Sequence, residues 1–145
     1  MINIAVLNGP NLSNLGDREP EIYGKETPSD ILIQLGEFAE KCGCSVTFEQ
    51  HDTQGELCEA VNRLSGVSKG LVINPGGFSH TSVAVMDAMR AFKGPVIEVH
   101  ISQIHRREPF RHRMLTAQSA DVVISGAGTR GYLSAIELIM ELLRR

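Results

Sequence analysis

Short apolar runs alternate with helical patterns along the chain. The runs are rich in β-branched residues, and the continuous apolar character of 2–7 is typical of a strand buried on both faces in a parallel sheet. The segments between them space their apolar residues three or four apart, as at Ile31, Leu35 and Phe38, and this period predicts amphipathic helices. The pattern predicts strands at 2–7, 45–49, 70–73, 95–99 and 121–125, and helices at 28–42, 55–64, 81–92 and 132–144.

Strands that alternate with helices predict one sheet covered on both faces, because each right-handed crossover returns a helix to the sheet. We expect a single α/β domain over residues 1–145, a flavodoxin-like doubly wound sheet of five parallel strands in the order 2-1-3-4-5. Ligands of such sheets bind beyond the carboxyl ends of the strands, at the switch point between strands 1 and 3. Two long polar loops, 8–27 and 101–113, leave this edge, and loops of that length in compact domains usually form lids or binding sites.

The charge of the chain indicates the kind of ligand. A formal net charge of −3 argues against a nucleic-acid-binding protein, whose affinity rests on many Lys and Arg side chains that neutralise phosphates. Arg106, Arg107, Arg111 and Arg113 nonetheless lie close together in the second long loop. A local cluster of this kind suits one small anion.

The sequence also bears on the cellular compartment. Cys42, Cys44 and Cys58 fit neither a disulfide framework nor a zinc or redox motif, so we expect reduced thiols. There is neither the basic and apolar pattern of a signal peptide nor an apolar run of about 20 residues that could cross a membrane. We therefore expect a soluble, cytoplasmic protein without membrane contact.

The loop after strand 1 contains Arg18 and Tyr23. A phenol is a poor base at neutral pH because its ordinary pKa is near 10, but a nearby guanidinium favours the phenolate. The two residues could thus form a basic pair. In the alternative, Tyr23 packs its ring under the loop and Arg18 pairs with Glu19 or Glu21.

The glycine turn after strand 3, from Asn74 to Ser82, feeds the N-terminus of a helix. Free backbone N–H groups and the positive end of the helix dipole favour polar or anionic ligand groups at such a place, and His80 lies at its mouth. In the alternative, Ser79 or Thr81 caps the helix and His80 is solvated.

Glu98 and His100 lie two apart on strand 4, so both side chains point the same way at the carboxyl edge. A carboxylate beside an imidazole fixes its orientation and favours its protonated form, which suits a general acid, although a lone histidine is more often structural. Arg107 and Arg111, four apart, would share one face if their loop is helical, and a substrate carboxylate or diol is a natural partner. A solvated basic patch is the alternative for either arginine.

Other chemistries have little support. The pattern G-x-G-x-x-G at 126–131 lacks the following strand and acidic residue that a dinucleotide site needs about 20 positions on, so we interpret it as a turn. Neither histidine nor carboxylate spacing indicates a metal site. Strand 3 ends in Asn74 where a phosphoacceptor would need an aspartate, and only Lys25 is in range to form a Schiff base.

Together the polar segments resemble the type II 3-dehydroquinate dehydratases. The resemblance runs through N-G-P-N-L, R-E-P-x-x-Y-G, N-P-G-G-x-x-H-T-S, E-V-H-I-S, R-E-P-F-R-H and a closing G-x-G-x-x-G-Y, in that order. It implies conversion of 3-dehydroquinate to 3-dehydroshikimate and water, a step of the shikimate pathway toward chorismate and the aromatic amino acids, without metal or organic cofactor.

The resemblance also assigns roles to residues. Tyr23 would be the base that takes the proton at C2, with Arg18 favouring its phenolate, and Asn11 would hold a water at the enolate oxygen. His100, oriented by Glu98, would protonate the departing C1 hydroxyl. The substrate's carboxylate and hydroxyls would be held by Asn74, His80, Arg111 and the backbone of Ile101 and Ser102, with Arg107 in support. Asp87 would reach the site of a neighbouring subunit, because the family assembles as a homododecamer built from trimers.

The chain departs from the family pattern at Ser13-Asn14, His51 and Met114. Ser13 and Asn14 lie on the loop of Tyr23, so they bear on lid motion and turnover rather than on the reaction itself. The alternative function is a flavodoxin-like module that holds a flavin or nucleotide without turnover. Such a module predicts visible absorbance, or binding that depends on Gly128 and Gly131.

Overall fold

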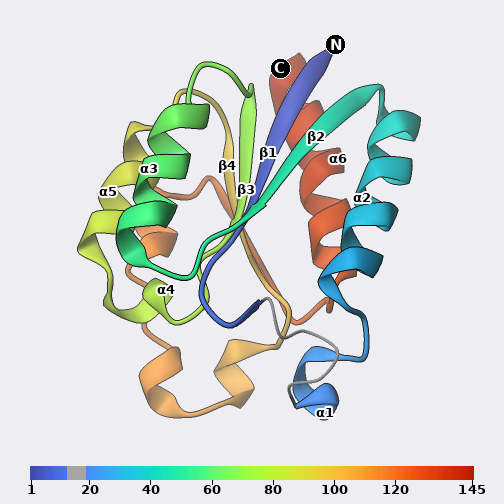
Figure 1. The fold of residues 1–145 in the computed structure, drawn as a ribbon. Coiled ribbons are helices and arrows are strands. Elements are labelled where there is room, and N and C mark those ends of the chain that lie inside the picture. The colour runs from blue at the N-terminus through green and yellow to red at the C-terminus, as the bar shows by residue number, and fades with distance from the viewer. Residues whose placement is uncertain (13–18) are drawn as a thin grey trace.

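The computed structural model describes residues 1–12 and 19–145 and contains a parallel sheet with the strand order β2-β1-β3-β4-β5 (Figure 1). This is the order predicted from the sequence, and it places β1 beside β3 at the switch point. The predicted strand bounds differ from the observed ones by one residue at most. The strands are β1 (Ile2–Asn8), β2 (Cys44–Gln50), β3 (Gly70–Asn74), β4 (Val96–His100) and β5 (Val122–Ser125).

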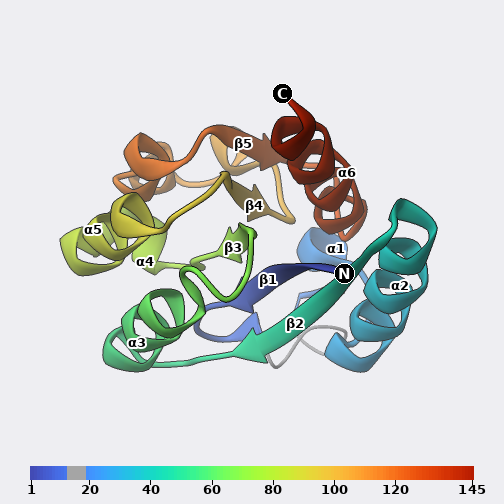
Figure 2. The ribbon, with the colours of Figure 1, turned by 90° about the horizontal axis from the view of Figure 1, so that it is seen from above.

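Helices cover both faces of the sheet, as the view from above shows (Figure 2). One face carries α2 (Pro28–Cys42) and α6 (Arg130–Arg144), and the other carries α3 (Gln54–Leu64) and α5 (Val83–Ala91). The fold is therefore the doubly wound, flavodoxin-like α/β arrangement. The shorter elements are α1 (Pro20–Tyr23), α4 (Phe78–Thr81) and the 3₁₀ turns η2 (Ile104–Arg106), η3 (Pro109–Arg111) and η4 (Thr116–Ser119).

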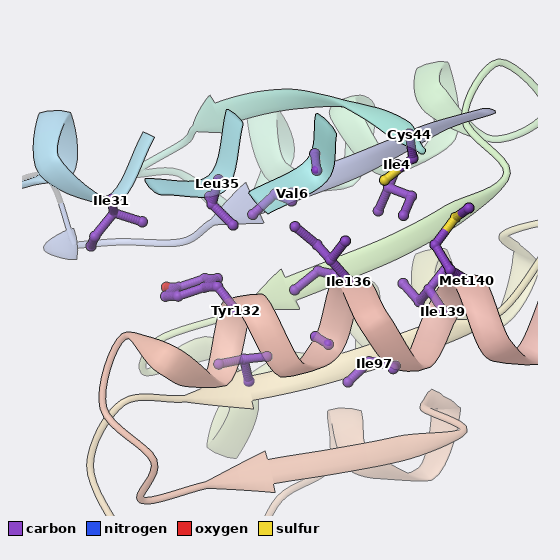
Figure 3. Packing of buried hydrophobic residues seen from close by; sticks show 14 of the residues in the cluster. Ile4, Val6, Ile31, Leu35, Cys44, Ile97, Tyr132, Ile136, Ile139 and Met140 are labelled. Carbon is purple, nitrogen blue, oxygen red and sulfur yellow. The ribbon is translucent and has the colours of Figure 1, made fainter. Parts of the chain in front are cut away.

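Two hydrophobic cores result from the alternation of side chains along the strands. β1 sends Ile4 and Val6 toward α2 and α6, and Ala5 and Leu7 toward α3 and α5. Burial of a large apolar side chain contributes about 1.5–3 kcal/mol, so these contacts hold α6 firmly on the sheet. Figure 3 shows the α6 side chains that face β1, β4 and α2 in this core, namely Tyr132, Ile136, Ile139 and Met140.

The helix predicted at 81–92 is wrong in one respect, because the chain breaks at Ser82 into α4 and α5. Ser82 adopts an extended conformation, and its hydroxyl accepts a hydrogen bond from the backbone N–H of Val85 at 2.9 Å. Such a side-chain acceptor satisfies an N–H that a new helix would otherwise leave unpaired. Ser82 is thus the cap of α5, and neither Ser79 nor Thr81 has the capping role considered from the sequence.

The strand register brings three polar strand ends to the same edge. Asn8 of β1 pairs with Asn74 of β3, and Ile73 of β3 pairs with Glu98 of β4. β4 therefore ends at His100, two residues after Glu98 and at the same edge. This edge is the carboxyl edge of the sheet, where α1, η2 and η3 also lie (Figure 1). Within residues 1–12 and 19–145, no helix is long and apolar enough to cross a membrane.

Candidate active site

A pocket of about 140 Å³ opens at the carboxyl edge, between the loops that follow β1, β3 and β4. The sequence predicted a site at this edge, and most of the residues proposed for it gather around one cavity. Its walls combine backbone from a glycine turn with amide, imidazole and guanidinium groups. The lining residues are Pro10, Asn11, Leu12, Asn74, Gly76, Gly77, His80, His100, Ile101, Ser102, Ile104, Arg107 and Arg111.

Glu98 and His100 form a buried pair on β4. His100 Nε2 lies 2.6 Å from Glu98 Oε2, and the Glu98 side chain has no solvent exposure. The predicted orientation of both side chains to one face of β4 is confirmed. Because Nε2 is engaged by the carboxylate, Nδ1 is the ring nitrogen left to face the pocket.

Two hydroxyl groups complete the surroundings of Glu98. Ser79 Oγ donates to Oε2 at 3.4 Å, and Thr116 Oγ1 donates to Oε1 at 2.5 Å. A buried carboxylate needs such donors, because burial without compensation disfavours its charge. Sequence reasoning missed Thr116, which follows the second long loop and shows no motif or spacing that points to β4.

His80 lies beside His100, with the two rings stacked at a centroid distance of 6.5 Å. Its Nδ1 lies 2.8 Å from the carbonyl oxygen of Arg113. Burial lowers the pKa of His80, the Arg113 carbonyl opposes this shift, and the charges of His100 and Arg111 lower the pKa further. A neutral His80 that donates from Nδ1 keeps Nε2 as a hydrogen-bond acceptor. The half-buried, hydrogen-bonded ring does not fit the solvated alternative.

A buried tyrosine orients the asparagines at the ends of β1 and β3. Tyr132 on α6 donates its hydroxyl to Asn8 Oδ1 at 2.6 Å and accepts a hydrogen bond from Asn74 Nδ2 at 3.0 Å. Burial raises the pKa of Tyr132, so the phenol stays protonated and the direction of both bonds is fixed. The backbone N–H of Gly76 donates to Asn74 Oδ1 at 3.2 Å. Asn74 therefore has one amide N–H left to donate.

Arg107 and Arg111 both line the pocket, but they do not share one helix. Arg107 lies between the separate turns η2 and η3, where Pro109 opens the second turn. Arg111 Nε lies 3.3 Å from Glu108 Oε2, and Arg107 Nη1 donates to Ser102 Oγ at 3.3 Å. The side chain of Arg107 is only 13% exposed and that of Arg111 only 21%. Neither value fits a solvated basic patch. Arg106 and Arg113 are exposed.

Asn11 lies at the mouth of the pocket in a left-handed backbone conformation, with φ 68°. Its backbone N–H donates to Asp52 Oδ1 at 3.3 Å, and Gln50 Nε2 donates to the carbonyl oxygen of Gly9. A third bond joins His51 N–H to the carbonyl oxygen of Asn8 at 2.9 Å. The loop after β1 is thus fastened to the end of β2.

Two of the proposed residues have side chains outside the described part of the chain, and Asp87 lies away from the pocket. Arg18 lies outside the described residues, and so does the side chain of Tyr23, whose backbone ends α1. The choice between a basic pair and a structural role for these two stays open. Asp87 is exposed on α5 and does not line the pocket.

The remaining sequence features have structural explanations. Gly126 and Gly128 adopt positive φ in the turn between β5 and α6, and a Cβ on Gly131 would lie 3.1 Å from Val99 Cγ1. The glycines thus serve a tight turn and close helix packing.

The residues that depart from the family pattern lie outside the pocket or outside the described residues. His51 bonds Glu49 Oε1 at 2.8 Å, away from the pocket, and Met114 is half-buried. Ser13 and Asn14 lie outside the described residues. Across residues 1–12 and 19–145, no group of three His, Cys, Asp or Glu residues could hold a metal ion.

A doubly wound parallel sheet with a buried Glu–His pair beside an arginine-lined pocket is the arrangement of a flavodoxin-like α/β protein with a candidate active site. The model of the family "Dehydroquinase class II" matches residues 2–140. The chain belongs to this enzyme family.

Individual relatives agree with the family match. The 3-dehydroquinate dehydratase of Bartonella bacilliformis is 48% identical over 97% of this chain and 89% of its own length. 3-Dehydroquinate dehydratase 2 of Agrobacterium fabrum is 48% identical over 97% of this chain and 95% of its own. The crystal structure of the type II dehydroquinase from Propionibacterium acnes superimposes with a TM-score of 0.94 at 37% identity, covering 97% of both chains.

Proposed function

We propose that this chain is a hydro-lyase that converts 3-dehydroquinate to 3-dehydroshikimate and water in the shikimate pathway. The observation that carries the proposal is the buried Glu98–His100 pair at a pocket lined by Arg111, in a chain of this family. A loss of water from a hydroxy ketone needs a base beside the carbonyl and an acid at the departing hydroxyl. Residues 1–145 would act as one catalytic domain.

His100 is the general acid of the proposed reaction. Its Nε2 is held by the Glu98 carboxylate at 2.6 Å, and this contact fixes the orientation of the ring. The proton on Nδ1 then goes to the C1 hydroxyl, which leaves as water. The electron pair of the broken C–O bond departs with the oxygen, and the enolate collapses to the conjugated enone.

Tyr23 is the base that forms this enolate. As a phenolate favoured by Arg18, it takes the proton at C2, which is acidic because it is adjacent to the ketone. Asn11, at the mouth of the pocket, holds a water that donates to the enolate oxygen. In one turnover Tyr23 gains one proton and His100 loses one, so the net proton count of the enzyme is unchanged.

The pocket offers complementary groups for the substrate. The Arg111 guanidinium and the free amide N–H of Asn74 are donors for the carboxylate, together with the backbone N–H groups of Ile101 and Ser102. The neutral His80, whose Nδ1 is engaged by the Arg113 carbonyl, accepts from a substrate hydroxyl through Nε2. Arg107 supports this side through Ser102.

The family resemblance also supports an assembly. We propose a homododecamer built from trimers in the cytoplasm. In this assembly the exposed Asp87 of α5 reaches the pocket of a neighbouring subunit. Light scattering at dilute concentration measures this directly, and a monomer of 15.8 kDa would contradict it.

The reaction is tested by adding 3-dehydroquinate to the purified protein and following ultraviolet absorbance, which rises as the conjugated enone forms. No rise at any pH from 6 to 9 would overturn the proposal. A flavin-binding module without turnover predicts instead a yellow protein and no change with substrate. Borohydride added with substrate should leave the activity intact, because inactivation would indicate a lysine imine.

A further inference from the structure

The two oxygens of the Glu98 carboxylate have different partners. Oε2 contacts His100 Nε2 at 2.6 Å and receives the longer bond from Ser79 at 3.4 Å. Oε1 receives the hydroxyl of Thr116 at 2.5 Å. The terminal torsion of a glutamate is broad, so the carboxylate plane is set by whatever donates to its oxygens. Of the two hydroxyl donors to Glu98, Thr116 makes the shorter contact.

Thr116 itself is held in place by its own element. It is fully buried in η4, and the preceding Leu115 donates its N–H to the carbonyl oxygen of Ser79 at 2.8 Å. At the other end of η4, Ser119 Oγ donates to the Met86 carbonyl oxygen at 2.7 Å. A β-branched threonine is also stiff at χ1. Its hydroxyl therefore occupies a fixed position relative to β4.

We propose that Thr116 is a positioning residue for the dehydration: its hydroxyl holds the Glu98 carboxylate so that His100 presents Nδ1 to the leaving hydroxyl. Thr116 does not line the pocket, so it acts on the substrate only through Glu98 and His100. This inference rests on the proposed function of the pocket, in which His100 is the acid.

Such a role affects the chemical step more than substrate binding. The groups that grip the substrate come from other elements, and they keep their places when one hydroxyl behind Glu98 is removed. A misplaced catalytic group costs up to about 100-fold in rate. Loss of the Thr116 hydroxyl also takes one hydrogen-bond donor from the buried carboxylate, so the pH profile of kcat should differ between Thr116→Val and wild type.

The test compares Thr116→Val, which keeps the shape and removes the hydroxyl, with Thr116→Ser, which keeps the hydroxyl. We expect Thr116→Val to lower kcat roughly 10- to 100-fold with KM within about twofold, and Thr116→Ser to restore most of kcat. Thr116→Ala replaces the valine variant if the latter does not fold. Ser68→Ala is the matched control, because Ser68 is fully buried and donates to Asn3 Oδ1 at 2.6 Å, at the opposite edge of the sheet.

A structural role alone predicts a different result. Thr116→Val and Ser68→Ala would then both lower the unfolding midpoint and leave kcat and its pH profile near wild type, which would overturn the inference. A serine variant as slow as the valine variant would overturn it too, because the methyl group and not the hydroxyl would then matter.

A second readout separates this inference from the proposed reaction. Nitrogen-15 NMR of the His100 ring reports its tautomer and its contact with Glu98 without any turnover. We expect the His100 signals to shift in Thr116→Val and to stay unchanged in Ser68→Ala. If the wild-type protein does not act on 3-dehydroquinate, the proposed function fails, and the NMR comparison still decides whether Thr116 positions the pair.

Discussion

Tyr132 donates its hydroxyl to Asn8 at 2.6 Å, and this bond joins the first turn of α6 to the last residue of β1. The same oxygen accepts from Asn74 at 3.0 Å. One residue of the final helix thus sets the amide orientation at the ends of two adjacent strands. Asn74 lines the pocket while Tyr132 does not, so we expect any effect of Tyr132 on a ligand to act through Asn74.

Replacing Tyr132 with Phe removes this shared hydroxyl and leaves two buried amide groups without that partner. Each unsatisfied group costs about 1–3 kcal/mol, so the free energy of unfolding in urea should fall by roughly 2–6 kcal/mol for the two together. KM for 3-dehydroquinate should rise, since the Asn74 amide is free to rotate. Ser45→Ala, which removes a polar contact to Asn3 at the opposite edge, should leave KM unchanged. A Tyr132→Phe protein with wild-type KM would show that Asn74 needs no such support.

Glu98→Gln keeps the shape of the buried side chain and removes its charge. The imidazolium of His100 then lacks its anionic partner, and we expect kcat to fall about 10²- to 10⁴-fold, the range for loss of general acid catalysis. KM should change little, because Glu98 does not line the pocket. Glu59→Gln, which affects only an exposed pair with Arg63, is the control for steady-state rates. Equal rates in both variants would exclude the Glu98–His100 pair from the chemistry.

Tyr23→Phe tests the proposed base. We expect kcat to fall by orders of magnitude, as the phenolate that takes the C2 proton is absent, while circular dichroism and the unfolding midpoint stay near wild type. Near-normal turnover would favour the alternative in which Tyr23 only packs under its loop.

The lowered pKa of His80 should make the free energy of unfolding depend on pH. Its pKa is lowered in the folded state by burial, with His100 and Arg111 adding to the effect and the Arg113 carbonyl opposing it. Below about pH 6.5, the ordinary value for histidine, the unfolded chain takes up a proton that the folded protein does not. The contribution of His80 is therefore complete above that pH and is lost as the pH falls toward the folded pKa.

Urea unfolding midpoints at pH 7.5 and 5.5 measure this contribution. The difference between the two midpoints should shrink in His80→Asn relative to wild type. An unchanged difference would mean that the folded and unfolded states bind the proton of His80 equally well.

Gly9→Ala probes the contact between the loops that follow β1 and β3. A Cβ on Gly9 would lie 2.5 Å from the carbonyl oxygen of Pro75, which is backbone and cannot yield cheaply. We expect a loss of about 1–3 kcal/mol in stability, typical of overpacking, and a marked loss of activity because the pocket wall moves. Gly36→Ala in α2 meets open space and should stabilise the protein by about 0.5–1 kcal/mol. If the two variants are equally stable, the close approach of the loops is not maintained in solution.

The sequence predicts the sheet well because the strands are short runs rich in β-branched residues, bounded by glycine, proline or polar residues. It also predicts the Glu98–His100 pair, since the period of two along a strand is a local property. It does not predict the break at Ser82, where a side-chain cap competes with helix continuation. Nor does it predict Thr116 or Tyr132, which contact the site from 18 and 58 residues away along the chain. Such contacts depend on packing between elements, and no local period reports them.

Hydrogen bonds connect the loop after β1, which lines the pocket, to the end of the edge strand β2. β2 has a strand neighbour on one side only and is mostly half-buried, and segments with few buried contacts open most readily in a folded protein. If the end of β2 frays, the hydrogen bonds from Asn11 N–H to Asp52 and from Gln50 to the Gly9 carbonyl oxygen are lost with it. We therefore expect the fastened arrangement of the β1 loop to open more often than the core of the fold. A ligand that holds Asn11 in place should slow amide hydrogen exchange along β2, a strand that it never touches.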